Sequence, residues 1–357
     1  ELIQNIENKL SDLASEEDEP EQEPVRSMWL SYSRIAASLL LLMLAGMSYY
    51  YFKGTSQKVA TTSTPSEVTD IPPGTNRASL TLADGRIINL TDAIDGEIAN
   101  QSGIQITKVS EGQLAYVAES EKNGVEKQMK MNVLRTPKAG QYRITLSDGT
   151  KVWLNSESSI QFPAAFNTAT RKVKITGEVY FEVAGLYDRG KRIPFQVFCN
   201  NQYIEVLGTH FNVNSYGDEA EIKTTLLEGS VKVYTMNAES SQPGDSVRLK
   251  PGEQSLFKAF AGNVSPISVR KVDAEAAVAW KEGYFKFKDT DIKEVMRQLA
   301  RWYDLEVAFV GDLPRDQFTG YISKNVAISN VLNILEEGGD VKFTIKGKQV
   351  EVYNRHP

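Results

Sequence analysis

A long, predominantly apolar run stands out in the pattern of hydrophobic and polar positions: residues 35–52, eighteen in number, contain no charged side chain. At about 1.5 Å per residue, a helix of this length spans roughly 27 Å, close to the ~30 Å hydrocarbon layer of a bilayer. Trp29 and Tyr32 precede the run and Tyr49–Tyr51 lie at its end, and aromatic rings favour membrane interfaces. The pattern therefore predicts a single membrane-spanning helix over residues 29–52.

Other interpretations of the apolar run fit less well. A cleaved signal peptide needs small residues at its cleavage site, but this run leads into bulky residues from Met47 onward, and Met47 also stands where a lipoprotein would need its lipidated Cys. A buried helix of a soluble domain is usually shorter. The flanking charges do not orient the span, because Arg26 and Arg34 on one side balance Lys53 and Lys58 on the other.

The span separates two very unequal parts of the chain. Residues 1–28 form a short acidic stub, and because the chain begins with Glu1 rather than Met, we expect the stub to be the end of a truncated region. The net charge is −6, of which residues 1–25 contribute −8, so the remainder carries +2. After the span, residues 53–73 form a Ser/Thr/Pro-rich linker that is too polar to fold alone.

The hydrophobic period changes to two after the linker. Residues 78–90 alternate around Asp84–Gly85, and residues 142–154 alternate in the same way around Asp148–Gly149. An Asp-Gly pair between alternating segments predicts a β-hairpin with a type I′ turn, which needs positive φ. The two segments form a short internal repeat, and turn formation explains both aspartates better than a paired-carboxylate site does. We assign residues 74–135 to a hairpin-rich β extension.

Residues 136–272 carry strand patterns and turn signals throughout. Turn signals recur about every 10–15 residues between alternating apolar positions, which predicts an all-β domain. The pattern leaves two architectures open, a Greek-key sandwich and a stacked β-solenoid. The expected turns lie at Gly177, Asn200–Asn201, Glu228–Gly229 and Pro251–Gly252.

The pattern changes again near Trp280. Residues 280–357 predict a small α+β domain in the order β-α-β-β-α-β-β, large enough for a core of its own. Trp280, Trp302 and Tyr303 are expected in the core rather than in contact with a partner. Such small modules often serve for docking, for example by accepting an added strand at a free sheet edge.

Two helices are expected within this module. An apolar stripe running from Ile292 to Tyr303 predicts the first, with Asp289 or Thr290 as its N-cap. Residues 328–337 predict the second, which ends at Gly338–Gly339.

The composition excludes several classes of site. Cys199 is the only cysteine, so no intrachain disulfide forms, and with only His210 and His356 the usual His/Cys zinc spacing is missing. No Walker loop, dinucleotide fingerprint or nucleophile elbow is present. We therefore expect no cofactor, no metal and no enzyme activity on an external substrate. The absence of a basic stripe argues against nucleic-acid binding.

Five specific motifs lie between residues 136 and 255. They are Gln141–Ser156, Ile175–Val183 (Ile-Thr-Gly-Glu-Val-Tyr-Phe-Glu-Val), Val206–Val213 (Val-Leu-Gly-Thr-His-Phe-Asn-Val), Leu226–Val231 and Leu249–Gln254. Together these motifs resemble the FecR family of anti-sigma regulators. Residues 280–357 also resemble the domain that follows in family members from glycan-importing Gram-negative bacteria, which is related to the short N-terminal domain of secretins and TonB-dependent receptors.

The resemblance implies a mechanism. The periplasmic part, residues 53–357, would sense the signalling domain of a loaded outer-membrane TonB-dependent transporter through residues 280–357. The single span in the inner membrane would relay that state, and the cytoplasmic N-terminal side would hold or release an extracytoplasmic-function (ECF) sigma factor. Family members carry a longer helical N-terminal region than residues 1–28, and sigma binding depends on that region.

The resemblance also directs attention to Gly208–Thr209. Some family members cleave themselves at a Gly-Thr bond in this motif, and the Thr209 hydroxyl could attack the Gly208 carbonyl to convert the amide into an ester that water hydrolyses. Glycine tolerates the strained backbone that this step needs. The alternative interpretation is a glycine at a tight strand bend, and His210 as an assisting base is the weaker part of the hypothesis.

A functional interpretation from another class stays open beside the regulator. The chain could be a membrane-anchored, periplasmic, β-rich protein that binds envelope glycan or acts as a scaffold. Exposed aromatic platforms would favour that interpretation, and the specific match to regulator motifs counts against it. A third interpretation, a self-processing enzyme without a signalling role, would require cleavage without a protein partner.

Overall fold

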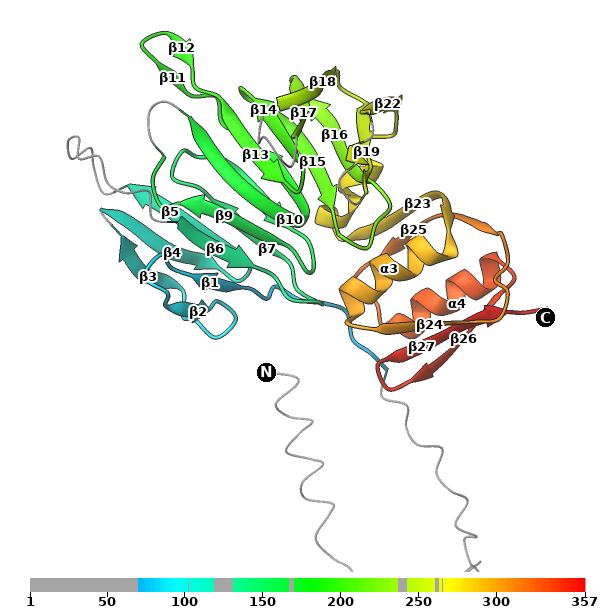
Figure 1. Ribbon diagram of the computed structural model, residues 1–357. Helices are drawn as coiled ribbons and strands as arrows, with labels where there is room; N and C mark the ends of the chain where they lie inside the picture. Colours follow the sequence, from blue (N-terminus) through cyan, green and yellow to red (C-terminus); the bar gives the residue numbers. More distant parts are fainter. Residues whose placement is uncertain are drawn as a thin grey trace, which may run out of the picture. The chain divides into compact units, whose positions relative to one another are not determined.

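The computed structural model describes residues 70–101, 103–118, 131–166, 170–236, 243–260, 263–264 and 266–356 (Figure 1). These residues belong to one compact unit, which comprises residues 68–357. Within the described ranges, no helix is both long and apolar enough to cross a bilayer. The predicted span, the acidic stub and most of the linker lie outside the described residues.

Eighteen strands form one hydrogen-bonded network, which we call the β domain. One strand, β10, belongs to two sheets and thereby joins them. Sheet I has the order β2-β1-β6-β9-β10-β13-β14-β17-β18 and contains β1 (Ser79–Thr81), β2 (Ile87–Asn89), β6 (Met131–Arg135), β9 (Ser159–Pro163), β10 (Arg171–Glu182), β13 (Phe195–Cys199), β14 (Gln202–Val206), β17 (Val231–Met236) and β18 (Pro243–Leu249).

Sheet II has the order β3-β4-β5-β7-β8-β10-β15-β16-β19-β22. Its further strands are β3 (Gly96–Gln101), β4 (Ile104–Ser110), β5 (Gln113–Ala118), β7 (Tyr142–Thr145), β8 (Lys151–Leu154), β15 (His210–Ser215), β16 (Ile222–Glu228), β19 (Glu253–Phe257) and β22 (Ser268–Lys271). Two small hairpins pair β11 (Tyr187–Asp188) with β12 (Lys191–Arg192) and β20 (Ala259–Phe260) with β21 (Asn263–Val264).

The strand order decides between the two predicted β architectures. In both sheets the described strands follow chain order from one end to the other, apart from the exchange of β1 and β2. A Greek key would bring its fourth strand back beside the first. The chain instead alternates between the sheets as it advances, so the β domain is a stacked double sheet. Apolar side chains of both sheets meet in one continuous core.

The prediction of a turn at Gly177 is wrong. The chain continues through this residue as the twelve-residue strand β10, which pairs in sheet I up to Thr176 and in sheet II from Gly177 onward. Gly177 has φ +77°, and a Cβ there would come within 2.8 Å of the Glu157 carbonyl oxygen. Glycine therefore marks a bend where the strand changes sheets, as it often does within strands.

The two Asp-Gly hairpins are present, but their turn type differs from the expectation. Strands β1 and β2 pair around Asp84–Gly85, and β7 and β8 pair around Asp148–Gly149. Only the glycines have positive φ (+89° and +82°), whereas a type I′ turn needs it at both central residues. Each aspartate instead accepts a hydrogen bond from the backbone N–H two residues later, at Arg86 or Thr150, which holds a longer loop.

The other predicted turns occur where expected and serve two purposes. Asn200–Asn201 joins β13 and β14 as a hairpin within sheet I. In contrast, Glu228–Gly229 leads from β16 to β17, and Pro251–Gly252 leads from β18 to β19, so both turns carry the chain between the sheets. We call such connections arches.

The C-terminal module confirms the predicted order β-α-β-β-α-β-β. It follows a 3-10 helix, η1 (Ala276–Glu282), and comprises β23 (Tyr284–Asp291), α3 (Ile292–Tyr303), β24 (Glu306–Val310), β25 (Gln317–Ser323), α4 (Ile328–Gly338), β26 (Val341–Lys346) and β27 (Gln349–Asn354). Strands β23 and β25 pair with each other, and β24-β27-β26 form a second sheet. The two helices lie between these two sheets (Figure 1), and all three layers contribute to one apolar core.

The N-cap of α3 differs from the prediction by one or two residues. Asp291 is the cap, because its carboxylate accepts a hydrogen bond of 2.9 Å from the backbone N–H of Glu294. Thr290 pairs with Phe318 in the β23–β25 ladder, and Asp289 has φ +48°. The expected core aromatics are buried: Trp302 and Tyr303 lie within the module, while Trp280 packs with Tyr180 of the β domain.

Candidate interdomain site

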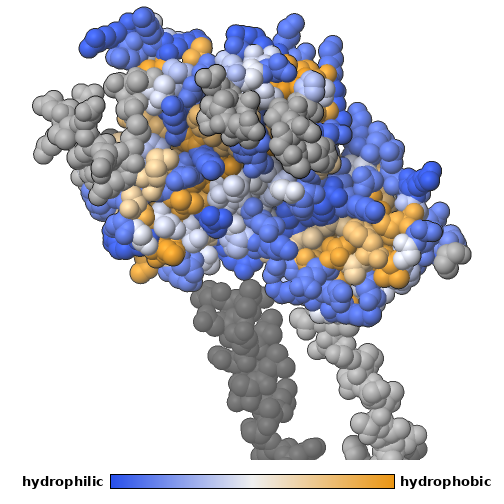
Figure 2. All heavy atoms as spheres, in the orientation of Figure 1, coloured by the Kyte–Doolittle hydropathy of each residue, from blue (hydrophilic) through white to orange (hydrophobic). Residues whose placement is uncertain are grey.

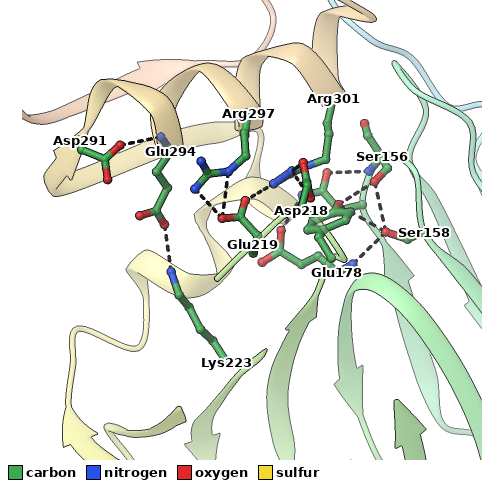
Figure 3. A network of polar contacts seen from close by, with 12 residues as sticks. Ser156, Ser158, Glu178, Asp218, Glu219, Lys223, Asp291, Glu294, Arg297 and Arg301 are labelled. Atoms are coloured by element: carbon green, nitrogen blue, oxygen red, sulfur yellow. Dashed lines mark hydrogen bonds and ion pairs between the residues drawn. The ribbon is translucent and has the colours of Figure 1, made fainter. Parts of the chain in front are cut away.

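Two arginines of α3 contact the β domain through a loop between β15 and β16. Arg301 donates to both oxygens of Asp218 (3.1 and 2.9 Å) and also to Glu219. Arg297 donates to the other oxygen of Glu219 through two nitrogens, at 3.1 and 2.7 Å. Spacing of i, i+4 places both arginines on one side of the helix. We call these four residues the clamp (Figure 3).

The clamp differs from ordinary surface ion pairs in that two of its charged side chains are buried. The side chains of Arg301 and Glu219 are only 6% and 5% exposed. The Arg301 guanidinium also lies 3.9 Å from the ring centroid of Tyr216, whose hydroxyl donates a 2.6 Å hydrogen bond to the Ser156 carbonyl. A charge buried this deeply is costly when its partner is removed, so the clamp holds α3 firmly against the β domain.

Further contacts flank the clamp. Lys223 of β16 pairs with Glu294 of α3 at 2.9 Å (Figure 3). The Arg301 carbonyl accepts a 2.8 Å hydrogen bond from the backbone N–H of Ala139. At Gly74, a Cβ would come within 2.8 Å of the Trp302 side chain, so glycine allows this close approach. The module is thus attached to the β domain by backbone, ionic and packing contacts.

A carboxylate lies on the outer side of sheet II beneath the module. Glu178 of β10 accepts hydrogen bonds from Asn155 (2.8 Å) and Asn212 (3.0 Å), and the Trp280 indole donates to Asn212 at 3.3 Å. Burial raises the pKa of Glu178, while the two amides and the charges of Arg301 and Lys324 oppose the shift. The amides therefore fix the carboxyl group of Glu178 in place.

Lys324 is a buried cation in a largely neutral environment. Its ammonium donates to the Gln141 side chain and to the Trp280 carbonyl, both at 3.3 Å, and lies 3.7 Å from the centroid of the Trp302 ring. Burial lowers the pKa of Lys324 to about 7, and the charge of Glu178 opposes part of this shift. The lysine joins residues of the β domain, η1 and the module.

A cavity of about 480 Å³ lies between these groups. Its lining comes from sheet II, η1, β23 and α3 and includes Glu178, Asn212, Asn214, Trp280, Gln298 and Arg301. The structure thus brings together polar residues of both domains around one partly open cavity. In the sequence, Glu178 and Asn212 stand out only as parts of motifs, and no pattern predicts that these polar residues form a site. The site arises only where segments distant in the sequence meet.

The predicted self-cleavage pair lies in an arch between β14 and β15. Gly208 has φ +152°, and Thr209 is buried, with its hydroxyl donating a 3.2 Å hydrogen bond to the Ser230 carbonyl. The next arch lies close by, since a Cβ at Gly229 would come within 2.9 Å of the Gly208 carbonyl oxygen. His210 pairs with Glu228 at 3.1 Å. The glycine thus lies at a strand bend, and the threonine hydroxyl is held.

Metal and thiol chemistry find no support in the described residues. No group of three or more His, Cys, Asp or Glu side chains among them could hold a metal ion. Cys199 is a free, buried thiol, and burial raises its pKa to about 12. A thiol with so high a pKa is a poor nucleophile.

Aromatic rings on the outer side of sheet I bear on the glycan-binding alternative. Phe198, Tyr203 and Tyr234 lie on adjacent strands with centroids 5.6 and 4.3 Å apart and nearly parallel planes. The Lys232 ammonium lies 4.5 Å from the centroid of the Tyr234 ring. The ring faces are therefore occupied by one another and by the lysine, and this row does not offer the open platform that sugar stacking requires.

The chain is similar to two family models and to two proteins of known structure. The family model "FecR protein" matches residues 132–232, and "FecR, C-terminal" matches residues 284–352. Two crystal structures, each of a candidate anti-sigma factor from Parabacteroides distasonis, are 26% identical with a TM-score of 0.54. They cover 63% and 62% of this chain, and the match spans 99% and 98% of theirs.

Comparison with curated proteins gives no match. Both matched segments lie within one compact unit. The two family models, together with the likeness to candidate anti-sigma factors of known structure, support a FecR-family anti-sigma factor.

Proposed function

We propose that this chain is a transmembrane anti-sigma factor. It relays the state of an outer-membrane TonB-dependent transporter to a cytoplasmic ECF sigma factor, and so controls transcription of uptake genes. The observation that carries the proposal is the pairing of a FecR domain with a FecR C-terminal domain, together with the likeness to a candidate anti-sigma factor.

The apolar run supports a single span in the proposed topology, and the family resemblance supports its orientation. Residues 29–52 span the inner membrane once, residues 1–28 lie in the cytoplasm, and residues 53–357 lie in the periplasm. Long domains translocate largely regardless of flanking charge, so the balanced charges beside the span allow this orientation. The sigma factor then binds on the side of the acidic stub.

The C-terminal module offers an edge on which the transporter's signalling domain can dock. Among the described strands, β24 pairs only with β27, so its other edge is free. Phe309 and Val310 on β24 are 40% and 51% exposed, and an apolar area is visible on the module's surface (Figure 2). A partner strand added at this edge would form backbone hydrogen bonds and cover these side chains.

The clamp provides the path from the docked module to the β domain. Helix α3 packs against β24 in the module core and carries Arg297 and Arg301 on its other side. A shift of α3 on docking would therefore alter ion pairs that reach the β15–β16 loop. In the proposed relay, the clamp is the element whose state changes when the transporter is loaded.

The test is affinity purification of the tagged full chain from cells of its native host, followed by mass spectrometry. We expect one ECF sigma factor and one TonB-dependent transporter to be enriched. Deletion of residues 1–28 should abolish sigma recovery, and Val310→Glu should reduce transporter recovery at least about tenfold, because a buried charge in such an interface costs more than ~1.4 kcal/mol.

The matched control is Ile87→Glu, which places the same charge on an exposed isoleucine of the β domain. It should leave both partners bound. Absence of any sigma factor from the wild-type sample would contradict the proposed function. Equal transporter recovery with Val310→Glu and Ile87→Glu would contradict docking at β24.

We also propose self-cleavage between Gly208 and Thr209. The Thr209 oxygen forms a bond to the Gly208 carbonyl carbon, the C–N bond breaks, and the freed Thr209 amine takes the hydroxyl proton. Water then hydrolyses the ester to leave a Gly208 carboxylate and the Thr209 hydroxyl. The unusual φ of Gly208 and the held hydroxyl of Thr209 support this step.

Self-cleavage predicts two fragments, residues 1–208 and 209–357, on a denaturing gel of wild-type protein. Thr209→Ala should give one intact band, because the nucleophile is gone, and Thr209→Ser should restore cleavage. The fragments should remain together without denaturant, because β10 pairs with β15 and β14 pairs with β17 across the cut. Intact wild-type protein would refute this part of the proposal.

A further inference from the structure

The cavity between sheet II and the module has the size of a ligand site. Its volume of about 480 Å³ falls within the ~300–1,000 Å³ range of small-molecule pockets. It lies where two domains meet, which is a common position for such sites. Its lining is predominantly polar, so an apolar ligand is a poor match.

The buried part of the lining contains polar atoms without hydrogen-bond partners among the described residues. Ser156 is 1% exposed, and its hydroxyl has no hydrogen-bond partner among the described residues. The side-chain oxygen of Asn214 is likewise buried and unpaired within the described part of the chain. Glu178 beside them is a fixed acceptor. Unpaired buried polar atoms are costly, and hydroxyl groups of a ligand, or water, would satisfy them.

The exposed part of the lining carries net positive charge, although the exposed Asp289 also belongs to it. Arg270, Lys271 and Lys288 line the cavity, and none of them forms an ion pair with an acidic side chain of the described residues. Arg270 is held by hydrogen bonds from Nε and Nη2 to Gln254, which leaves Nη1 unbonded within that part of the chain. The other exposed cation of the lining, Lys286, is neutralised by Asp273 at 2.7 Å. These three cations define a basic rim.

We propose that this cavity binds a small hydroxylated anion, such as a sugar acid or a sugar phosphate. Its hydroxyl groups would face Ser156, Asn214 and Glu178, and its carboxylate or phosphate would lie at the basic rim. Charge-assisted hydrogen bonds from lysine and arginine suit both anionic groups. Because both domains line the cavity, the bound anion bridges them. The site stands independently of the proposed sigma-factor role.

The test is isothermal titration calorimetry on the purified full chain at low salt, with D-glucuronate, glucose 6-phosphate and D-glucose as probes. We expect at least one of the two anions to bind, and D-glucose to bind at least about tenfold more weakly, since the rim interacts only with charge. The comparison of glucuronate with glucose 6-phosphate decides between a carboxylate and a phosphate ligand.

Two variants locate the binding. Lys271→Gln/Lys288→Gln should weaken anion binding at least about tenfold, and Asn214→Leu should abolish it by filling the buried part. The matched control, Lys172→Gln/Lys174→Gln, removes two exposed lysines of β10 on the outer side of sheet I and should leave the affinity unchanged. The rim variant alters only exposed side chains, so an unchanged melting temperature will show that it is folded.

Three results would overturn the proposal. They are no binding of either anion, equal binding of D-glucose and the anions, and equal affinity of the rim variant and the Lys172/Lys174 control. The last result would place any bound anion elsewhere on the protein. None of these results depends on the recovery of a sigma factor or transporter.

Discussion

At the scale of single residues, the buried pair Arg171–Asp148 shows how one turn residue acquired a second role. Asp148 holds its own loop, as the matching Asp84 does, but it also accepts a 2.8 Å hydrogen bond from a fully buried guanidinium. Arg171 further donates to the carbonyls of Ala184 and Ile193. The internal repeat therefore contains an exposed and a buried version of the same turn.

Arg171→Met should lower the free energy of unfolding by about 3–5 kcal/mol, because it leaves the Asp148 carboxylate buried without its partner. Arg86→Met is the matched control, since Arg86 pairs with Asp84 at 2.8 Å on the surface, and its cost should stay below about 1 kcal/mol. Urea unfolding of both variants checks this. Similar losses in the two variants would contradict the role assigned to burial.

Lys324 should make stability depend on pH. Its pKa of about 7 in the folded state lies below the ~10.4 of an unfolded chain, so between these values the unfolded state binds more protons and stability rises with pH. Between about pH 7 and about pH 8.5 the gain is roughly 2 kcal/mol from this group. Lys324→Met should remove that gain in urea unfolding at the two pH values. If the stability of wild type and variant changed equally with pH, the pKa of Lys324 would not be lowered in the folded state.

At the scale of elements, strand β10 holds the two sheets together by bending at one residue. Buried and exposed positions alternate up to Gly177, whereas Val179–Phe181 beyond it are all buried, because Tyr180 packs against Val278 and Trp280. The sequence pattern shows that alternation and the glycine, but not whether the chain turns back or goes on. The bend becomes evident only in the structure, where Glu157 and Ser158 approach Gly177 so closely that a side chain would not fit.

Gly177→Ala should destabilise the β domain by about 2–5 kcal/mol. A positive φ costs a non-glycine residue about 1–2 kcal/mol, and the added methyl group has no space, which adds about 1–3 kcal/mol. Gly185→Ala is the control, because its Cβ would meet nothing closer than 3.8 Å, and it should change stability by less than about 1 kcal/mol. Thermal unfolding of both variants measures the difference. Equal melting temperatures would mean that the bend tolerates a side chain.

Local elements could be predicted well because their signals are local. Apolar stripes predict the module's two helices, and the Asp-Gly pairs predict the hairpins. The predicted order of elements is therefore correct, whereas the predicted N-cap of α3 and the predicted turn type are wrong. The interdomain site could not be predicted in this way. Glu178, Arg301 and Lys324 look like ordinary polar residues in sequence, and only tertiary contacts bury them together.

At the scale of the whole molecule, the clamp determines how strongly the module and the β domain are coupled. Arg301 contacts Asp218, Glu219 and Tyr216 at once, whereas Arg297 contacts Glu219 alone among the described acidic residues. The two arginines share one carboxylate, so their contributions should not add.

Arg301→Gln should destabilise the compact unit by less than the ~3–5 kcal/mol that a fully unpaired buried charge costs, because Arg297 still pairs with Glu219. It should also speed hydrogen exchange in α3 and in residues 216–221. A double-mutant cycle with Glu219→Gln should give a coupling energy of about 1–3 kcal/mol. Lys348→Gln breaks the exposed pair with Asp304 and should cost less than about 1 kcal/mol. A coupling energy near zero would show that the clamp does not join the domains.

The stacked order of the β domain also bears on how such a protein can vary over evolutionary time. In a stack, each layer touches only its neighbours, so whole layers can be gained or lost at an end with little effect further away. The clamp loop lies between β15 and β16, whereas β2 and β3 are the edge strands at the other end of the two sheets. Length differences among relatives should therefore gather at the β2–β3 end, where the Asp84 hairpin already resembles a copy of the Asp148 hairpin.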